Sequence, residues 1–272
     1  MSALHHTRVV AEGANPSRWV LFLHGIFGSG ANWRTFARRW VERDPSWGAE
    51  LVDLRMHGAS QNLPPPHTVQ RAAQDLLELE LPGSVEAVVG HSFGGKVALA
   101  YVDARRGDLS RAVILDSTPG ARPDHRGSES TLEVLAFLER VGAQPNRDAF
   151  ITRAQEAGIS LGIAQWLAMN LERRGESMVL KLDLEAIRSL LNDYFRIDLW
   201  KTLERPPGRV HFDIVLGGRS TVFDASERAR LNAIVTAHPD RVRVTELPHA
   251  GHWVHVDDPE GVAKVLLENQ VP

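Results

Sequence analysis

The chain of 272 residues carries a formal net charge of −3, is 43% hydrophobic and contains 0 cysteines. The slightly negative charge argues against general binding to nucleic acid or to an anionic membrane. The lack of cysteine excludes disulfides, thiol nucleophiles and cysteine-based metal sites. Residues 1–15 are polar, and no apolar run approaches the roughly 20 residues that span a bilayer. We therefore expect a cytoplasmic protein that associates with no membrane.

Short apolar runs alternate with helical patterns over the first 118 residues. The runs predict strands that are buried on both faces of a parallel sheet, at residues 19–23, 50–54, 87–89 and 112–115. The intervening patterns predict helices at residues 33–41, 69–79 and 94–105, with Thr68 as the N-cap of the second. This alternation is typical of an α/β protein with a doubly wound, mostly parallel sheet.

From Pro119 to Pro207 the alternation stops and only helical patterns follow, at residues 132–141, 148–157, 163–173 and 184–194. Predicted strands at 212–216 and 242–247 then alternate with predicted helices at 226–237 and 259–268. We therefore expect residues 1–118 and 206–272 to form an α/β core. Residues 119–205 are predicted to form an all-helical lid inserted between two core strands.

A Gly-x-Ser-x-Gly pattern, Gly90-His-Ser92-Phe-Gly94, follows one predicted strand and begins the next helix. A strand that reverses this sharply into a helix holds its central residue in a strained backbone conformation. Side chains two positions to either side would collide, which explains the glycines. This context predicts that Ser92 is a nucleophile and that the Phe93 amide faces the group it attacks. The alternative interpretation is a glycine-rich turn that occurs by chance.

A serine nucleophile needs a base, and His252 lies between the last predicted strand and the last helix. Gly251 lets this loop turn tightly enough for the imidazole to approach Ser92. His249, His252 and His255 are spaced three residues apart, as the ligands of a metal site could be. In a segment that leads from a strand into a loop, however, side chains at this spacing do not point toward one metal ion. We therefore predict no metal site and no cofactor.

An oxyanion hole requires two backbone N–H groups aimed at one point. Phe93 is expected to supply one of them. The loop His24-Gly-Ile26-Phe-Gly-Ser-Gly30 follows the strand at 19–23, and the Ile26 amide is the natural second donor. The alternative is that this glycine-rich loop merely turns the chain.

Taken together, four sequence blocks resemble the α/β hydrolases, in particular esterases with a lid: residues 24–29, 53–60, 90–95 and 251–255. The resemblance covers almost the whole chain outside the lid interior. It implies a serine hydrolase that cleaves carboxylic esters through an acyl-enzyme intermediate. The composition of the lid favours small, apolar substrates, and we expect a monomer or homodimer. We expect Phe27, Trp166, Met169 and Trp253 to line the substrate pocket.

The catalytic acid departs from the commonest family pattern. Where most members carry Asp after the next-to-last strand, this chain has Ser220 and Thr221. Asp224 follows later, at an N-cap position of the helix at 226–237. A branch of small esterases places the acid after the strand that follows the nucleophile helix, which corresponds here to Asp116. We predict Asp116 as the acid, with Asp224 as the alternative.

Several other activities use the same scaffold. A cofactor-free perhydrolase or haloperoxidase, a thioesterase and a C–C bond hydrolase share the triad, and these sequence motifs do not separate them from an esterase. A non-catalytic ligand-binding protein of the same fold is a further alternative from another class. Such proteins usually lose a triad residue or an oxyanion glycine, whereas this chain keeps Ser92, His252 and the loop glycines.

Overall fold

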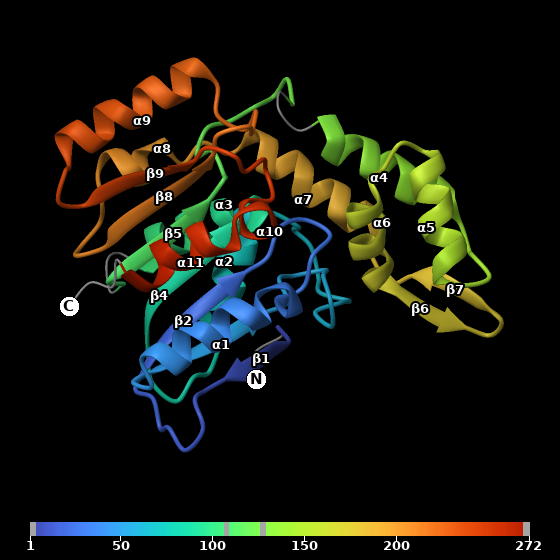
Figure 1. Cartoon of the computed structure of the whole chain (residues 1–272), viewed down its shortest axis with the longest axis horizontal. Coiled ribbons are helices and arrows are strands. Elements are labelled where there is room, and N and C mark those ends of the chain that lie inside the picture. Colours follow the sequence, from blue (N-terminus) through green and yellow to red (C-terminus); the bar gives the residue numbers. More distant parts are fainter. Residues whose placement is uncertain (1–3, 106–108, 126–128, 269–272) are drawn as a thin grey trace.

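The computed structural model describes residues 4–105, 109–125 and 129–268 (Figure 1). A seven-stranded sheet crosses the core in the order β1-β3-β2-β4-β5-β8-β9. β1 (His6–Val9) pairs antiparallel with β3, and every other neighbouring pair is parallel. The parallel strands are β2 (Arg18–Leu23), β3 (Trp47–Val52), β4 (Ser84–His91), β5 (Arg111–Leu115), β8 (His211–Gly217) and β9 (Val242–Leu247). The prediction of a doubly wound, mostly parallel sheet is confirmed.

Helices cover both faces of this sheet. On one face, α1 (Arg34–Arg43) and α11 (Pro259–Glu268) pack apolar side chains such as Trp40 and Leu266 against the strands. The other face is covered by α2 (Val69–Leu77), α3 (Phe93–Arg105), α8 (Trp200–Glu204) and α9 (Ala225–Ala237). Thr68 caps α2 as predicted, because its hydroxyl accepts a hydrogen bond from the Arg71 amide at 3.1 Å. Within the described ranges, no helix is both long and apolar enough to cross a membrane.

Between β5 and β8 the chain leaves the sheet. It forms α4 (Glu129–Val141), α5 (Arg147–Glu156), α6 (Leu161–Leu167), β6 (Leu171–Arg174), β7 (Ser177–Leu180) and α7 (Leu184–Arg196), which we call the insertion. In Figure 1, α4, α5, α6 and the β6–β7 hairpin form a lobe beside the core, and α7 leads from this lobe back to the core.

The expectation of an all-helical insertion is wrong at one place. The helix predicted at 163–173 ends at Leu167, a short 3-10 turn (Ala168–Asn170) follows, and the chain then enters the β6–β7 hairpin. Gly175 has φ +60° at the hairpin turn, a left-handed conformation that glycine adopts at little cost. Leu171 and Met178 are buried, but strands of four residues are too short to reveal a two-residue period in the sequence.

One buried lysine ties the insertion to the core. The ammonium group of Lys96, on α3, donates hydrogen bonds to the carbonyl oxygens of Gly120 and Tyr194 at 2.7 Å and of Ile197 at 3.2 Å. Gly120 precedes the insertion, whereas Tyr194 and Ile197 lie at its end. Burial lowers the pKa of Lys96 to about 7, because removal from water disfavours the charged form. A single side chain of the core is thus hydrogen-bonded both to the segment that leads into the insertion and to the segment that leads out of it.

Candidate active site

Ser92 lies at the sharp turn between β4 and α3, with φ +53°. This left-handed conformation is costly for a residue with a side chain, by about 1–3 kcal/mol. A Cβ atom at Gly90 would collide with the carbonyl oxygen of Gly94, and one at Gly94 would lie 2.5 Å from the carbonyl oxygen of His24. Both glycines are therefore required by close backbone contacts, which hold the Ser92 side chain at the carboxyl edge of the sheet.

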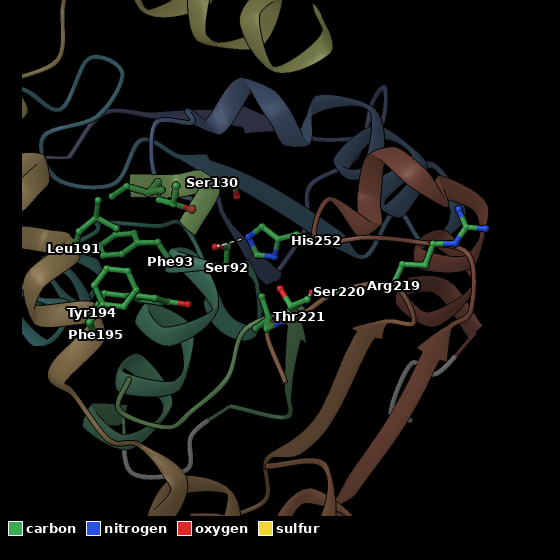
Figure 2. Close-up of a pocket in the computed structure, with 13 residues that line it drawn as sticks. Ser92, Phe93, Ser130, Leu191, Tyr194, Phe195, Arg219, Ser220, Thr221 and His252 are labelled. Atoms are coloured by element: carbon green, nitrogen blue, oxygen red, sulfur yellow. Dashed lines mark hydrogen bonds between the residues drawn. The ribbon is translucent and has the colours of Figure 1, made fainter. Parts of the chain in front are cut away.

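Three side chains form a continuous hydrogen-bonded relay. The Ser92 hydroxyl lies 3.0 Å from His252 Nε2, and His252 Nδ1 lies 2.7 Å from Asp116 Oδ2 (Figure 2 draws the first of these bonds). Because a carboxylate only accepts, Nδ1 carries the proton and Nε2 is free to accept from the serine. Ser92, Asp116 and His252 follow β4, β5 and β9, so the carboxyl ends of three parallel strands bring them together.

The Asp116 carboxylate is buried but has three hydrogen-bond donors. Besides His252, the Gly217 amide donates to Oδ1 at 3.0 Å and the Ser220 hydroxyl donates to Oδ2 at 2.6 Å. Ser220 lies in the loop after β8, the position at which most members of the family carry the catalytic Asp. The structure therefore brings that loop to the carboxylate, where it provides donors to a negative charge rather than a second acid.

Asp224, the alternative acid, forms the N-cap of α9. Its carboxylate accepts a hydrogen bond from the Glu227 amide at 2.8 Å, and the Glu227 side chain accepts one from the Asp224 amide at 3.1 Å. This reciprocal arrangement is a capping box. Asp224 is thus located at the beginning of a helix, as its position in the sequence also suggested.

The proposed oxyanion donors lie on the two elements that border Ser92. Ile26 follows β2, Phe93 begins α3, and both line the same cavity as Ser92. Among the described residues, neither amide donates a hydrogen bond inside the protein, so both N–H groups remain available. Phe27 has φ +64°, and this left-handed residue turns the loop immediately after Ile26.

Ser92 borders two cavities. The larger has a volume of about 140 Å³ and extends toward Leu191 and Tyr194 of α7 (Figure 2). The smaller, of about 40 Å³, is lined by three of the predicted pocket residues: Phe27, Trp166 and Trp253. Met169 differs from this expectation, because it lines a separate hollow of about 300 Å³ near β1 and its side chain is 50% exposed. Met169 lies in the 3-10 turn that follows the end of α6 at Leu167, and not on the predicted continuation of that helix.

The family model described as the alpha/beta hydrolase family matches residues 20–265. The chain belongs to this α/β-hydrolase family.

Relatives of this α/β hydrolase include two named enzymes and a solved structure. The chain is 30% identical over 249 residues to the sn-1-specific diacylglycerol lipase ABHD11 of Mus musculus, covering 89% of this chain and 77% of the relative. It is 26% identical over 258 residues to esterase YbfF of Escherichia coli strain K12, covering 94% of each. A marine microorganism esterase matches with a TM-score of 0.79 at 23% identity, covering 98% of this chain and 99% of that one. That structure supports the fold.

Sequence reasoning missed His91 as a residue of the hydrolase site. Its Nε2 atom donates to the carbonyl oxygen of His252 at 2.8 Å. Burial, followed by the neighbouring histidines His255 and His252, holds the pKa of His91 well below its usual value, so the ring stays neutral. A neutral ring has one N–H, and this contact assigns it to Nε2. His91 thereby anchors the backbone of the loop that carries the imidazole. His91 occupies the first variable position of the Gly-x-Ser-x-Gly motif, and the motif itself does not indicate this role.

Asn170 is the second residue that the sequence did not single out. It is 5% exposed, and its side-chain amide donates to the carbonyl oxygen of Phe27 at 2.8 Å. This bond joins the insertion of the hydrolase directly to the loop that carries Ile26. The two partners are far apart in the sequence, so only the folded chain reveals the contact.

The other two histidines of the segment have different surroundings. His255 packs against His91 with ring centroids 4.5 Å apart, and burial lowers its pKa to about 4. His249 is exposed. Across residues 4–105, 109–125 and 129–268 of the hydrolase, no three histidine or acidic side chains are arranged to hold a metal ion.

Proposed function

We propose that the protein is a serine hydrolase that cleaves carboxylic esters of small, apolar substrates through an acyl-enzyme intermediate. The observation that carries the proposal is the relay from Ser92 through His252 to Asp116, with separations of 3.0 Å and 2.7 Å. Ester is the bond class that the names of the esterase and lipase relatives indicate.

In this proposal, His252 Nε2 removes the hydroxyl proton as Ser92 Oγ attacks the ester carbonyl carbon. The tetrahedral oxyanion accepts hydrogen bonds from the amides of Ile26 and Phe93. The imidazolium then protonates the departing alkoxide, leaving an acyl group on Ser92. Water, deprotonated by the same imidazole, releases the carboxylic acid and restores the serine hydroxyl. Asp116 is the acid that holds Nδ1–H in place and stabilises the imidazolium.

The smaller cavity supports a substrate with an apolar group, whereas the larger one also has polar walls from Ser130, Thr131 and Thr221. Leu191, Phe195 and Val222 contribute to the larger one, while Phe27, Trp166 and Trp253 surround the smaller. Arg219 also borders the larger cavity, but its guanidinium points away from Ser92 in Figure 2. The cytoplasmic location and the monomeric or homodimeric state remain predictions from the sequence.

The experiment is hydrolysis of p-nitrophenyl acetate and butyrate by the wild type beside Ser92→Ala. We expect the variant to lose at least about 10⁴-fold in kcat, because no neighbouring group replaces the nucleophile. A Ser130→Ala variant is a matched control, since Ser130 lines the same cavity outside the relay. Equal rates for wild type and Ser92→Ala contradict the proposal, as does the absence of turnover in both.

A further inference from the structure

A second hollow is lined in part by Trp166 and Trp253. It has a volume of about 590 Å³ and is bordered by the start of α1, by α6 and by α10 (Val254–Asp257). Its apolar lining includes Phe36 and Val256. The Val256 side chain is 65% exposed, although valine is among the residues most often buried. This region therefore presents apolar surface to solvent that the fold itself does not cover.

The hollow lies next to the site at Ser92 and shares three of its walls. Ile163, Trp166 and Trp253 line both this hollow and the cavity of about 40 Å³ that contains Ser92 and His252. The rings of Trp166 and Trp253 meet edge to face, with centroids 4.7 Å apart. These two side chains, one from the insertion and one from the core, form the partition between the hollow and the reacting serine.

Volume distinguishes the three spaces. Sites that bind small molecules usually enclose about 300–1,000 Å³. The two cavities at Ser92 measure about 140 Å³ and 40 Å³, so they accommodate a reacting carbonyl group with short substituents. The hollow, at about 590 Å³, falls within the usual range. A substrate with a long substituent must extend beyond the cavities at Ser92.

The chemistry of the hollow favours hydrocarbon. Of its lining side chains only Asp257 is charged at neutral pH, and its carboxylate accepts a hydrogen bond from the Gly251 amide at 2.8 Å. His255 also lines the hollow, and its low pKa, caused by burial, keeps the ring neutral. The lining therefore provides no cation for an anionic group, whereas Phe36, Ile163, Val256 and the two tryptophans provide apolar contact.

We propose that the hollow between α6 and α10 binds the hydrocarbon chain of a long-chain ester, and that the contact between the Trp166 and Trp253 rings opens to admit this chain. This inference rests on the proposed function, because it keeps the ester group at Ser92, and it replaces the small substrate of that proposal with one that carries a long hydrocarbon chain. The acyl chain and the alcohol chain have the same chemistry, and the experiment distinguishes them.

Gly162 provides a direct way to fill the hollow. It lies on α6, it lines the hollow, and a Cβ atom at this position would meet nothing within 4 Å. We therefore expect the ring of Gly162→Phe to occupy part of the hollow, because its Cβ enters open space. Gly162→Ala is the matched control, since it makes the same change in backbone freedom but adds only a methyl group. Unfolding midpoints of both variants verify that the fold is retained.

The first measurement is kcat/KM for p-nitrophenyl esters from acetate to dodecanoate, and for dodecyl acetate. In the wild type we expect about a fourfold rise for each methylene that enters the hollow. Gly162→Phe should lose at least tenfold on the long-chain ester whose chain occupies the hollow, with acetate unchanged within twofold. Loss on p-nitrophenyl dodecanoate identifies the acyl chain, and loss on dodecyl acetate identifies the alcohol chain. Equal effects on short and long esters, or none on either, overturn the proposal.

A second measurement separates this inference from the proposed function. Binding of dodecanoate and of dodecanol to Ser92→Ala, with and without Gly162→Phe, is followed by calorimetry. Weaker binding of either by at least tenfold in the double variant supports the chain site, even if the wild type hydrolyses no ester. Unchanged binding of both ligands in the double variant overturns it, even if short esters are hydrolysed.

Discussion

The core and the insertion contribute different chemistry to the same site. Ser92, Asp116 and His252 all lie on core turns, and Ser92 and Asp116 have left-handed backbone conformations, with φ +53° and +43°. The insertion contributes mostly apolar walls, such as Trp166 and Leu191, and reaches the loop that carries Ile26 through Asn170. Two of the three relay residues thus occupy left-handed turns of the core, while side chains of the insertion form part of the cavity walls.

The largest expected effect tests whether the acid belongs to the core turn after β5. Asp116→Asn should lower kcat about 10⁴-fold, because the amide no longer favours the Nδ1–H tautomer or stabilises the imidazolium. Asp224→Asn should leave kcat within about twofold, since Asn is an equally good N-cap for α9. Both are measured with p-nitrophenyl butyrate at matched unfolding midpoints. The reverse ranking of the two variants would refute our assignment of the acid.

A second test concerns the attachment of the insertion by Lys96. Folding lowers the pKa of this lysine from 10.5 to about 7, so above about pH 7 the unfolded chain binds more protons than the folded protein. The contribution of Lys96 to the free energy of unfolding therefore increases with pH in this range. Between roughly pH 7 and pH 9, wild-type stability should rise relative to Lys96→Met by up to about 2.7 kcal/mol.

Urea denaturation of both proteins at the two pH values measures this difference. Lys201→Met is the matched control, because Lys201 is an exposed lysine on α8. Its stability difference from the wild type should not change with pH in this way. A constant difference between the wild type and Lys96→Met would mean that the ammonium keeps its usual proton affinity when buried.

The smallest expected effect concerns the hydrogen bond between the insertion and the loop that carries Ile26. Asn170→Ala removes the donor to the Phe27 carbonyl oxygen, and the loop carrying Ile26 loses one restraint. We expect kcat for p-nitrophenyl butyrate to fall by about threefold to tenfold, which corresponds to the net worth of one hydrogen bond. The same substitution at Asn232, which is exposed on α9, should change nothing. An effect on KM alone would assign Asn170 to substrate binding instead.

Most of the core could be predicted because its patterns are local. The strand at Val242–Leu247 and the helix at Pro259–Glu268 have the predicted bounds, and the other parallel strands differ by a few residues at their ends. β1 was missed because His6–Val9 is a short edge strand with exposed positions, so it lacks the apolar run that reveals a buried strand. The β6–β7 hairpin was missed for a related reason, since each strand has only four residues.

The sequence by itself determined the strand–turn–helix around Ser92, because steric demands among neighbouring residues require Gly90 and Gly94 there. It also indicated His252, through its position between the last strand and the last helix, and the resemblance to small esterases indicated Asp116. Only the tertiary structure decided that Ser220 donates to Asp116, that His91 supports the His252 loop and that Asn170 and Lys96 join the insertion to the core. These contacts link residues distant in the chain, and their geometry depends on how the strands and the insertion pack.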